Sequence, residues 1–204
     1  MIKQLIKYCT ASILLFALGC EYNTDNSTAN LKASFQESAA LCRYVDLQQL
    51  QQVVMLSVPY IKQEPNYCGP ASAAMILNYM GSNVTQDQIG SGLVDSTGTN
   101  PTELKDRVES FGYYLSVVSC GFNNLLSLLD DGRPVIVRIL NNTKDNGHYI
   151  VVKGYDMNKM LVYVNDPQNQ SRGSINFSDF RALWDINSLG QEQNSYNLML
   201  IISK

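Results

Sequence analysis

The stretch Gln63-Glu-Pro-Asn-Tyr-Cys-Gly-Pro-Ala-Ser72 decides the fold, because it places a cysteine directly before the strongest helical pattern of the chain. That pattern runs from Pro70 to Met80 as an amphipathic helix, with apolar residues at positions i, i+3, i+4 and i+7: Ala73, Ile76, Leu77 and Met80. The unpaired N–H groups and the dipole at a helix N-terminus favour an anion and lower the pKa of a thiol. We therefore predict that Cys68 opens this helix as a reactive thiol.

His148 is the only histidine in the 204 residues, so any imidazole chemistry depends on it. A cysteine nucleophile needs such a base beside it, because the thiolate attacks while the free thiol is mostly protonated at neutral pH. We expect the fold to bring His148 to Cys68, which would create a cysteine-dependent acyl-transfer site.

A partner for His148 follows from a predicted β-hairpin whose turn is Asp156-Met-Asn-Lys159. If residues 156 and 159 pair, His148 lies opposite residue 167, with Asp166 within side-chain reach on the adjacent strand. A carboxylate there would fix the tautomer of the imidazole. Asn165 is a competing partner whose side chain we expect on the opposite face, and Asp145 lies in the loop before His148.

Gln63 is the predicted donor to an oxyanion, together with the backbone N–H of Cys68. Glu64 and Asn66 are alternatives by proximity, although a carboxylate would oppose an oxyanion. Each site residue also has a plainer explanation: a lone histidine on a strand is usually packed, and an aspartate before proline usually forms a turn. The occurrence of all four residues where one site could form favours the catalytic interpretation.

The order of the predicted elements, helices first and strands later, indicates an α+β fold with a mostly antiparallel sheet. The predicted helices lie within 37–52 and over 70–80, 85–93, 101–111, 123–131 and 178–185. The predicted strands cover 53–58, 113–119, 134–139, 148–155, 160–165 and 198–202. The nearly continuous apolar run at 134–139 indicates a strand buried on both faces, and Trp184 is predicted to be a core anchor.

Residues 1–20 have the pattern of an export signal, in which Lys3 and Lys7 precede an apolar run too short to span a bilayer. The run ends in Ala17-Leu-Gly-Cys20, which resembles the lipobox of bacterial lipoprotein precursors, although Ala17 stands where leucine is usual. An uncleaved anchor and an ordinary signal peptide are the alternatives. We expect lipidation at Cys20, and a place at the outer membrane or cell surface of the bacterial envelope rather than at the inner membrane.

The expected organisation is a signal peptide over 1–20, a polar tether over 21–36 and one domain over 37–204. Cys9 would leave with the signal and Cys20 would carry lipid. In an oxidising envelope two of the remaining three cysteines are expected to pair. With Cys68 as the nucleophile the implied disulfide is Cys42–Cys120, and two separate buried thiols are the alternative.

The composition of the chain indicates which classes of partner are not expected. Its formal net charge is -3, only 16% of residues are charged, and no lysine–arginine cluster is present, so nucleic acid is not an expected partner. One histidine and scattered cysteines give no metal-ligand spacing, and we expect neither a metal nor a cofactor. We expect a monomer.

Four segments resemble the motifs of the C39-like cysteine peptidases, a papain-like group: Val58-Pro-Tyr-Ile-Lys-Gln63, Cys68-Gly-Pro-Ala-Ser72, Gly147-His-Tyr-Ile-Val-Val-Lys-Gly-Tyr155 and Val162-Tyr-Val-Asn-Asp-Pro167. The resemblance covers residues 53–203. It implies a papain-like fold with the catalytic cysteine at a helix N-terminus, packed on the sheet. The roles it implies are a nucleophile at Cys68, a general base at His148, an orienting residue at Asp166 and an oxyanion-hole donor at Gln63.

The resemblance does not carry over every property of the group. Members that trim double-glycine leader peptides are fused to export transporters, whereas this sequence shows an export signal, so we expect a different peptide or protein substrate. The leading hypothesis is a lipid-anchored cysteine peptidase that forms a thioester acyl-enzyme. The rivals are acyl or peptidyl transfer, as in phytochelatin-synthase-like proteins, and a non-catalytic C39-like peptide-binding module.

Overall fold

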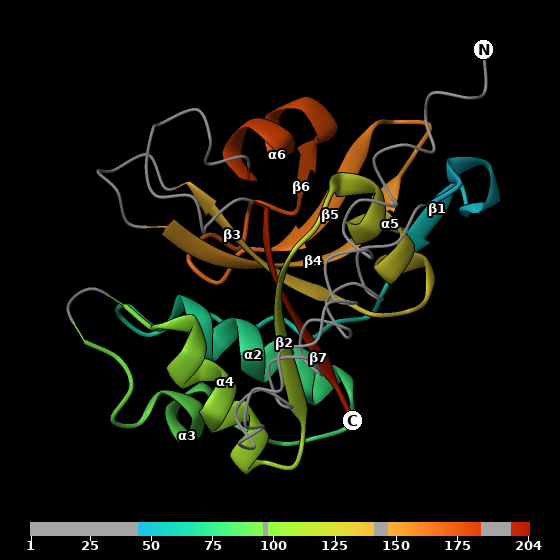
Figure 1. The fold of residues 1–204 in the computed structure, drawn as a ribbon. Coiled ribbons are helices and arrows are strands. Elements are labelled where there is room, and N and C mark those ends of the chain that lie inside the picture. The colour runs from blue at the N-terminus through green and yellow to red at the C-terminus, as the bar shows by residue number, and fades with distance from the viewer. Residues whose placement is uncertain (1–44, 96–97, 141–146, 185–196) are drawn as a thin grey trace, which may run out of the picture. The chain divides into compact units, whose positions relative to one another are not determined.

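The computed structural model describes residues 45–95, 98–140, 147–184 and 197–204, which belong to the compact unit Glu37–Lys204 (Figure 1). The predicted signal peptide, the tether, Cys20, Cys42 and most of the helix predicted within 37–52 lie outside the described residues. The described end of that helical segment forms the short 3-10 turn η2 (Leu47–Gln49). Among the described residues, no helix has the length and apolar character needed to cross a membrane.

A seven-stranded sheet forms the centre of this unit. Its order is β2-β7-β3-β4-β5-β6, with β1 also paired to β4, and every pair among the described strands is antiparallel. The strands are β1 (Val53–Met55), β2 (Tyr114–Ser119), β3 (Val135–Leu140), β4 (Gly147–Asp156), β5 (Leu161–Asn165), β6 (Ser174–Asn176) and β7 (Leu198–Ser203). The helices are α2 (Cys68–Tyr79), α3 (Gln86–Gly90), α4 (Pro101–Ser110), α5 (Phe122–Asp130) and α6 (Phe177–Trp184). The predicted α+β class with an antiparallel sheet is confirmed, while β6 was not predicted.

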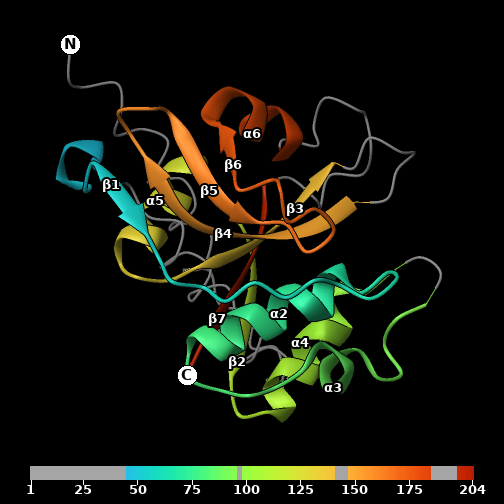
Figure 2. The ribbon, with the colours of Figure 1, turned by 180° about the vertical axis from the view of Figure 1, so that it is seen from behind.

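Helices cover both faces of the sheet: α2, α3 and α4 lie on one side, and α5 and α6 on the other (Figures 1 and 2). Two clusters of buried apolar side chains fill these interfaces. Strand β3 contributes Ile136 to the α2 side and Val137 to the α5–α6 side, so the predicted burial on both faces is confirmed. Trp184 is 1% exposed, and its Nε1 donates to the carbonyl oxygen of Leu198 at 3.1 Å, which confirms it as a core anchor.

Helix α2 is buried on all sides along most of its length, and every residue from Gly69 to Leu77 is buried. The prediction of an amphipathic helix is therefore wrong, because α2 lies between the sheet and the helices α3 and α4. Its one buried hydroxyl, that of Ser72, donates to the carbonyl oxygen of Tyr149 on β4 at 3.4 Å. This bond ties the helix that begins at Cys68 to the strand that carries His148.

The β4–β5 hairpin has a wider turn than predicted. Asp156 pairs with Leu161 rather than with Lys159, because residues 157–160 form the turn. The Oδ1 of Asp156 accepts a hydrogen bond from the backbone N–H of Lys159 at 2.9 Å, which closes the turn from within.

A bulge in β4 lies where β1 pairs with that strand. The register with β5 shifts between Val152 and Gly154. A Cβ atom at Gly154 would lie 2.2 Å from the carbonyl oxygen of Val54, so only glycine permits this approach. Strand β1 is shorter than the predicted strand over 53–58 and pairs only with residues 154–156 of β4.

Replacing Gly154 by alanine is expected to destabilise the domain by about 1–3 kcal/mol, because the added methyl group collides with the backbone of β1. Guanidinium unfolding followed by the fluorescence of Trp184, the only tryptophan, measures the change. Gly173→Ala is the matched control, since a Cβ atom there meets nothing within 4 Å. Equal loss of stability in the two variants would contradict this packing argument.

Candidate active site

Cys68 is the first residue of helix α2 and has a free, partly buried thiol. The N-cap residue, Tyr67, makes no side-chain hydrogen bond to the first turn. Burial raises the pKa of the Cys68 thiol. Hydrogen bonding to the His148 side chain, backbone hydrogen bonds from Tyr149 and Gly69, and the charge of His148 outweigh burial and bring the pKa below its ordinary value of 9.0. The surroundings therefore favour the thiolate.

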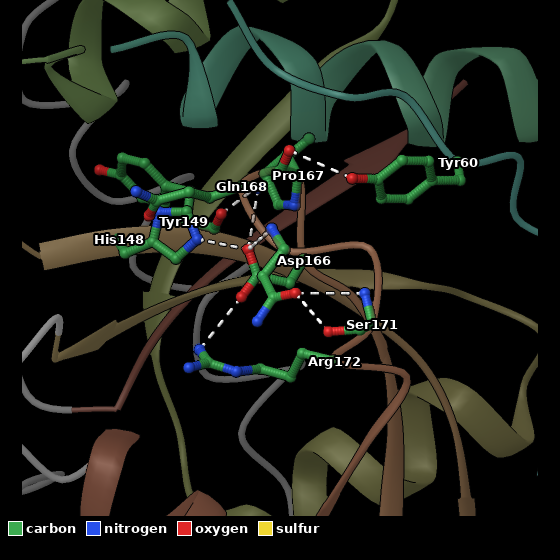
Figure 3. Close-up of polar contacts among 10 residues, drawn as sticks. Tyr60, His148, Tyr149, Asp166, Pro167, Gln168, Ser171 and Arg172 are labelled. Atoms are coloured by element: carbon green, nitrogen blue, oxygen red, sulfur yellow. Dashed lines mark hydrogen bonds and ion pairs between the residues drawn. The ribbon is translucent and has the colours of Figure 1, made fainter. Parts of the chain in front are cut away.

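His148, near the start of β4, and Asp166, directly after β5, form a buried ion pair (Figure 3). The Nε2 of His148 lies 2.7 Å from the Oδ1 of Asp166, and the two residues are only 5% and 2% exposed. Burial lowers the pKa of His148, but hydrogen bonds with Asp166 and Cys68 and their charges raise it from 6.5 to about 9. Burial raises the pKa of Asp166. The hydrogen bond with His148 and the charge of His148 are the largest of the effects that outweigh burial and lower this pKa below its ordinary value. The imidazolium is therefore the favoured form at neutral pH.

Asp166 does not reach His148 in the way the sequence predicted. Asn165, the last residue of β5, pairs with Val151, and the ladder ends there. Asp166 thus approaches His148 from the turn after the strand, not from an opposed position within it. The predicted contact is present, but the predicted register is wrong, because the wider turn and the bulge both change the pairing.

Three other donors hold the Asp166 carboxylate in place (Figure 3). The backbone N–H groups of Gln168 and Asn169 donate to its Oδ1 at 3.0 and 3.2 Å. The Nη1 of Arg172 lies 3.0 Å from its Oδ2. Sequence reasoning missed Arg172, because it lies in a polar turn without periodicity. Asp166 thus accepts hydrogen bonds from the backbone of its own turn, as aspartates often do, and also pairs with His148.

Gln63 lies beside this turn. Its backbone N–H donates to the carbonyl oxygen of Pro167 at 3.0 Å, and the Tyr60 hydroxyl donates to the same oxygen at 3.3 Å. The segment before Cys68 is therefore attached directly to the residue that follows Asp166.

Gln86 of helix α3 holds the backbone on both sides of Gln63. Its Nε2 donates to the carbonyl oxygen of Lys62 at 2.9 Å, and its Oε1 accepts from the N–H of Glu64 at 3.1 Å. Nothing in the sequence indicated this contact, because it joins the first residue of α3 to a loop that is adjacent only in the folded chain.

A cavity of about 470 Å³ opens next to Gln63, lined by Lys62, Gln63, Glu64, Pro65, Pro167 and Gln168. The Oε1 of Gln63 is buried and has no hydrogen-bond partner within the described ranges. This oxygen is a hydrogen-bond acceptor, so a donor group of a bound molecule could satisfy it.

The alternative site residues lie elsewhere or have other partners. The Nδ2 of Asn165 donates to the carbonyl oxygen of Val58 at 3.0 Å, away from His148. The Nδ2 of Asn66 donates to the carbonyl oxygen of Asp95 at 3.2 Å. Asp145 lies outside the described residues.

Cys120, at the end of β2, is buried and disulfide-bonded. Its predicted partner, Cys42, lies outside the described residues, so the pairing of these two cysteines stays a prediction. Cys68 does not share in this bond.

The fold, with a free thiol at the start of a buried helix and an imidazole–carboxylate pair on an antiparallel sheet, is that of the papain-like cysteine proteases. The chain belongs to the Peptidase_C39 like family, whose model matches residues 55–191. It is thus a peptidase-like hydrolase by family. No curated protein matches the chain.

Solved structures agree with this fold. The peptidase domain of Streptococcus ComA, a bi-functional ABC transporter involved in quorum sensing, is 19% identical, with a TM-score of 0.54 over 71% of this chain and 96% of that one. A double glycine motif protease from an AMS/PCAT transporter, in complex with its leader peptide, is 22% identical, with a TM-score of 0.54 over 73% and 93%. The Prevotella intermedia cysteine protease interpain A is 14% identical, with a TM-score of 0.53 over 78% and 98%.

Proposed function

We propose that this chain is a cysteine peptidase in which Cys68 is the nucleophile, His148 the acid and base, and Asp166 the residue that orients His148. The observation that carries the proposal is the buried His148–Asp166 pair, which favours the imidazolium while the neighbouring thiol is biased toward the thiolate. Two opposite charges at adjacent reactive groups are the starting state for attack on a carbonyl.

The reaction proceeds in two stages. The Cys68 sulfur forms a bond to the carbonyl carbon, and the developing oxyanion accepts hydrogen bonds from the Cys68 N–H and the Gln63 side chain. The carbon–nitrogen bond then breaks, and the leaving amine takes the proton from His148. Water, deprotonated by the now neutral His148, attacks the thioester carbonyl. The carbon–sulfur bond then breaks, which releases the acyl product as a carboxylic acid and restores the Cys68 thiolate beside the His148 imidazolium.

The substrate in this proposal is a polypeptide. The structural relative from the AMS/PCAT transporter was solved with a leader peptide bound, which supports a peptide as the class of ligand. The cavity beside Gln63 provides space for residues next to the cleaved bond. A double-glycine leader is not the substrate we propose, because the sequence points to an exported protein.

Cleavage of a proteome-derived peptide library tests this function. The wild-type chain is expected to generate new amino termini. Cys68→Ala, which lacks the nucleophile and is expected to keep the fold, should generate none. Addition of a competing amine separates hydrolysis from transfer, since a transferase would attach the amine to the acyl product. Binding of peptides without any cleavage would favour the non-catalytic module instead.

We also propose that the chain is a lipoprotein of the bacterial envelope, because residues 17–20 resemble a lipobox. Replacing Cys20 by serine is expected to abolish incorporation of radiolabelled palmitate and to release the protein from the membrane fraction. Cys9→Ser is the control, since that residue would be removed with the signal. Palmitate labelling that persists in Cys20→Ser would refute the anchor without affecting the proposed catalysis.

A further inference from the structure

We infer that Arg138 and Tyr149 form a carboxylate-binding site next to Cys68, which recognises an acidic residue in the acyl half of the substrate. This inference rests on the proposed function, because it names a substrate feature of the same site. Neither residue belongs to the machinery described above as nucleophile, base, orienting residue or oxyanion donor.

Arg138 lies on β3 directly opposite Tyr149 on β4, so the two side chains leave the same face of the sheet. This is the face on which Tyr149 packs in the cluster with helix α2. The Arg138 side chain crosses Gly147, where a Cβ atom would lie 2.0 Å from Nε and 2.4 Å from Cζ. The guanidinium therefore lies against the residue that precedes His148, and a side chain at position 147 would displace it.

Arg138 is half-buried, and within the described ranges its guanidinium has neither a hydrogen bond nor an ion pair. The other described arginines are all engaged by carbonyl oxygens, a carboxylate or an aromatic ring: Arg107, Arg133, Arg172 and Arg181. A partly desolvated guanidinium without an anion is costly, and its planar fork suits a carboxylate. Arg138 is thus the one described arginine whose partner the fold does not supply.

Tyr149 interacts with both Arg138 and the proposed nucleophile, Cys68. Its backbone hydrogen bond contributes to the lowered pKa of Cys68. Burial raises the pKa of the Tyr149 hydroxyl, with Arg138 opposing and Cys68 adding to this effect, so the group stays a protonated donor. That hydroxyl, too, makes no hydrogen bond within the described part of the chain. An acceptor placed between Arg138 and Tyr149 would therefore satisfy two donors close to the reacting sulfur.

The position of this donor pair indicates which half of the substrate it binds. Strand β4 lies between β3, which carries Arg138, and β5, which leads to Asp166. The cavity beside Gln63 is bounded by Pro167 and Gln168 and so lies on the β5 side. An extended substrate that crosses Cys68 would place one half on each side. We assign the leaving half to the cavity and the acyl half to Arg138 and Tyr149.

Four matched vinyl sulfones test this assignment: acetyl-Glu-Gly and acetyl-Gly-Glu vinyl sulfone, each beside its Gln counterpart. The measured quantity is the second-order rate of Cys68 labelling, followed by intact mass. Wild type is expected to react about tenfold faster with the better Glu probe than with its Gln counterpart, the size of one charge-assisted hydrogen bond. Arg138→Gln should remove this ratio, Tyr149→Phe should reduce it, and Arg138→Lys should retain part of it.

Arg133→Gln is the matched control, because Arg133 is a surface arginine paired with Asp131 just before the same strand. It should keep the wild-type ratio. Rates for Glu and Gln probes that are equal in wild type, or a ratio that survives in Arg138→Gln, would overturn the carboxylate site alone. Failure of every probe to label wild-type Cys68 would overturn the proposed function as well. Tyr149→Phe and Arg138→Lys decide the question if Arg138→Gln does not fold.

Discussion

Replacing His148 by alanine is expected to reduce kcat/KM for peptide hydrolysis by a factor on the order of 10³, the usual contribution of a general acid–base group. The variant loses both the proton donor for the leaving amine and the cation that favours the Cys68 thiolate. Because the chain has no second histidine, no neighbouring imidazole can substitute. Steady-state hydrolysis of a peptide identified from the library measures the loss.

The circular dichroism spectrum and total thiol content of His148→Ala should match those of the wild type, which separates lost chemistry from lost folding. Hydrolysis within tenfold of the wild-type value in a folded variant would contradict the assigned role. Added imidazole is expected to restore part of the activity by entering the vacated space.

Replacing Asp166 by alanine is expected to destabilise the fold by about 3–5 kcal/mol, because removal of one partner leaves a buried charge uncompensated. His148 is 5% exposed and Asp166 is 2% exposed, so water does not replace the lost partner. Arg172 loses its partner in the same variant. Denaturant unfolding at several pH values measures the effect.

The stabilisation by this pair has a defined pH window. The pKa of His148 is raised from 6.5 to about 9 on folding, so its contribution is complete below pH 6.5 and is lost as the pH rises through about 9. The pKa of Asp166 is lowered below 3.8 on folding, so its contribution is present above pH 3.8 and is lost as the pH falls through the lower folded value. The stability difference between wild type and Asp166→Ala should therefore be largest between pH 3.8 and 6.5.

Two other variants delimit this prediction. Asp166→Asn keeps an acceptor oxygen of the same shape and should lose less stability than Asp166→Ala. Asp106→Ala removes an exposed carboxylate from α4 and should leave the stability nearly unchanged. A stability difference between wild type and Asp166→Ala that does not vary with pH would show that Asp166 does not raise the pKa of His148.

The elements that sequence patterns predicted well are those whose signals are local. Pro70 and the apolar spacing placed α2, and the continuous apolar run placed β3 in the buried centre of the sheet. The burial of α2 on all sides was not predicted. Its small residues, such as Gly69, Ala71 and Ser72, gave no apolar signal that would mark a second buried face in the sequence. Only the packing of α3 and α4 shows that this face is covered.

The contacts that sequence patterns could not predict are those set by distant segments. The bulge at Gly154 depends on the carbonyl oxygen of Val54 in a strand far away in the chain. Arg172 contacts the site from a loop and Gln86 from the first residue of the short helix α3, where no periodicity marks a residue. The types and spacing of the residues were thus enough to nominate a candidate site, whereas the contacts that fix its geometry required the fold.

The pH dependence of Cys68 alkylation by iodoacetamide tests the central claim most directly, with wild type compared to His148→Ala. Wild type is expected to react through a thiolate with a pKa below 9.0, and His148→Ala is expected to return the apparent pKa toward that ordinary value. Superimposable profiles for the two proteins, each with an ordinary thiol pKa, would contradict the account.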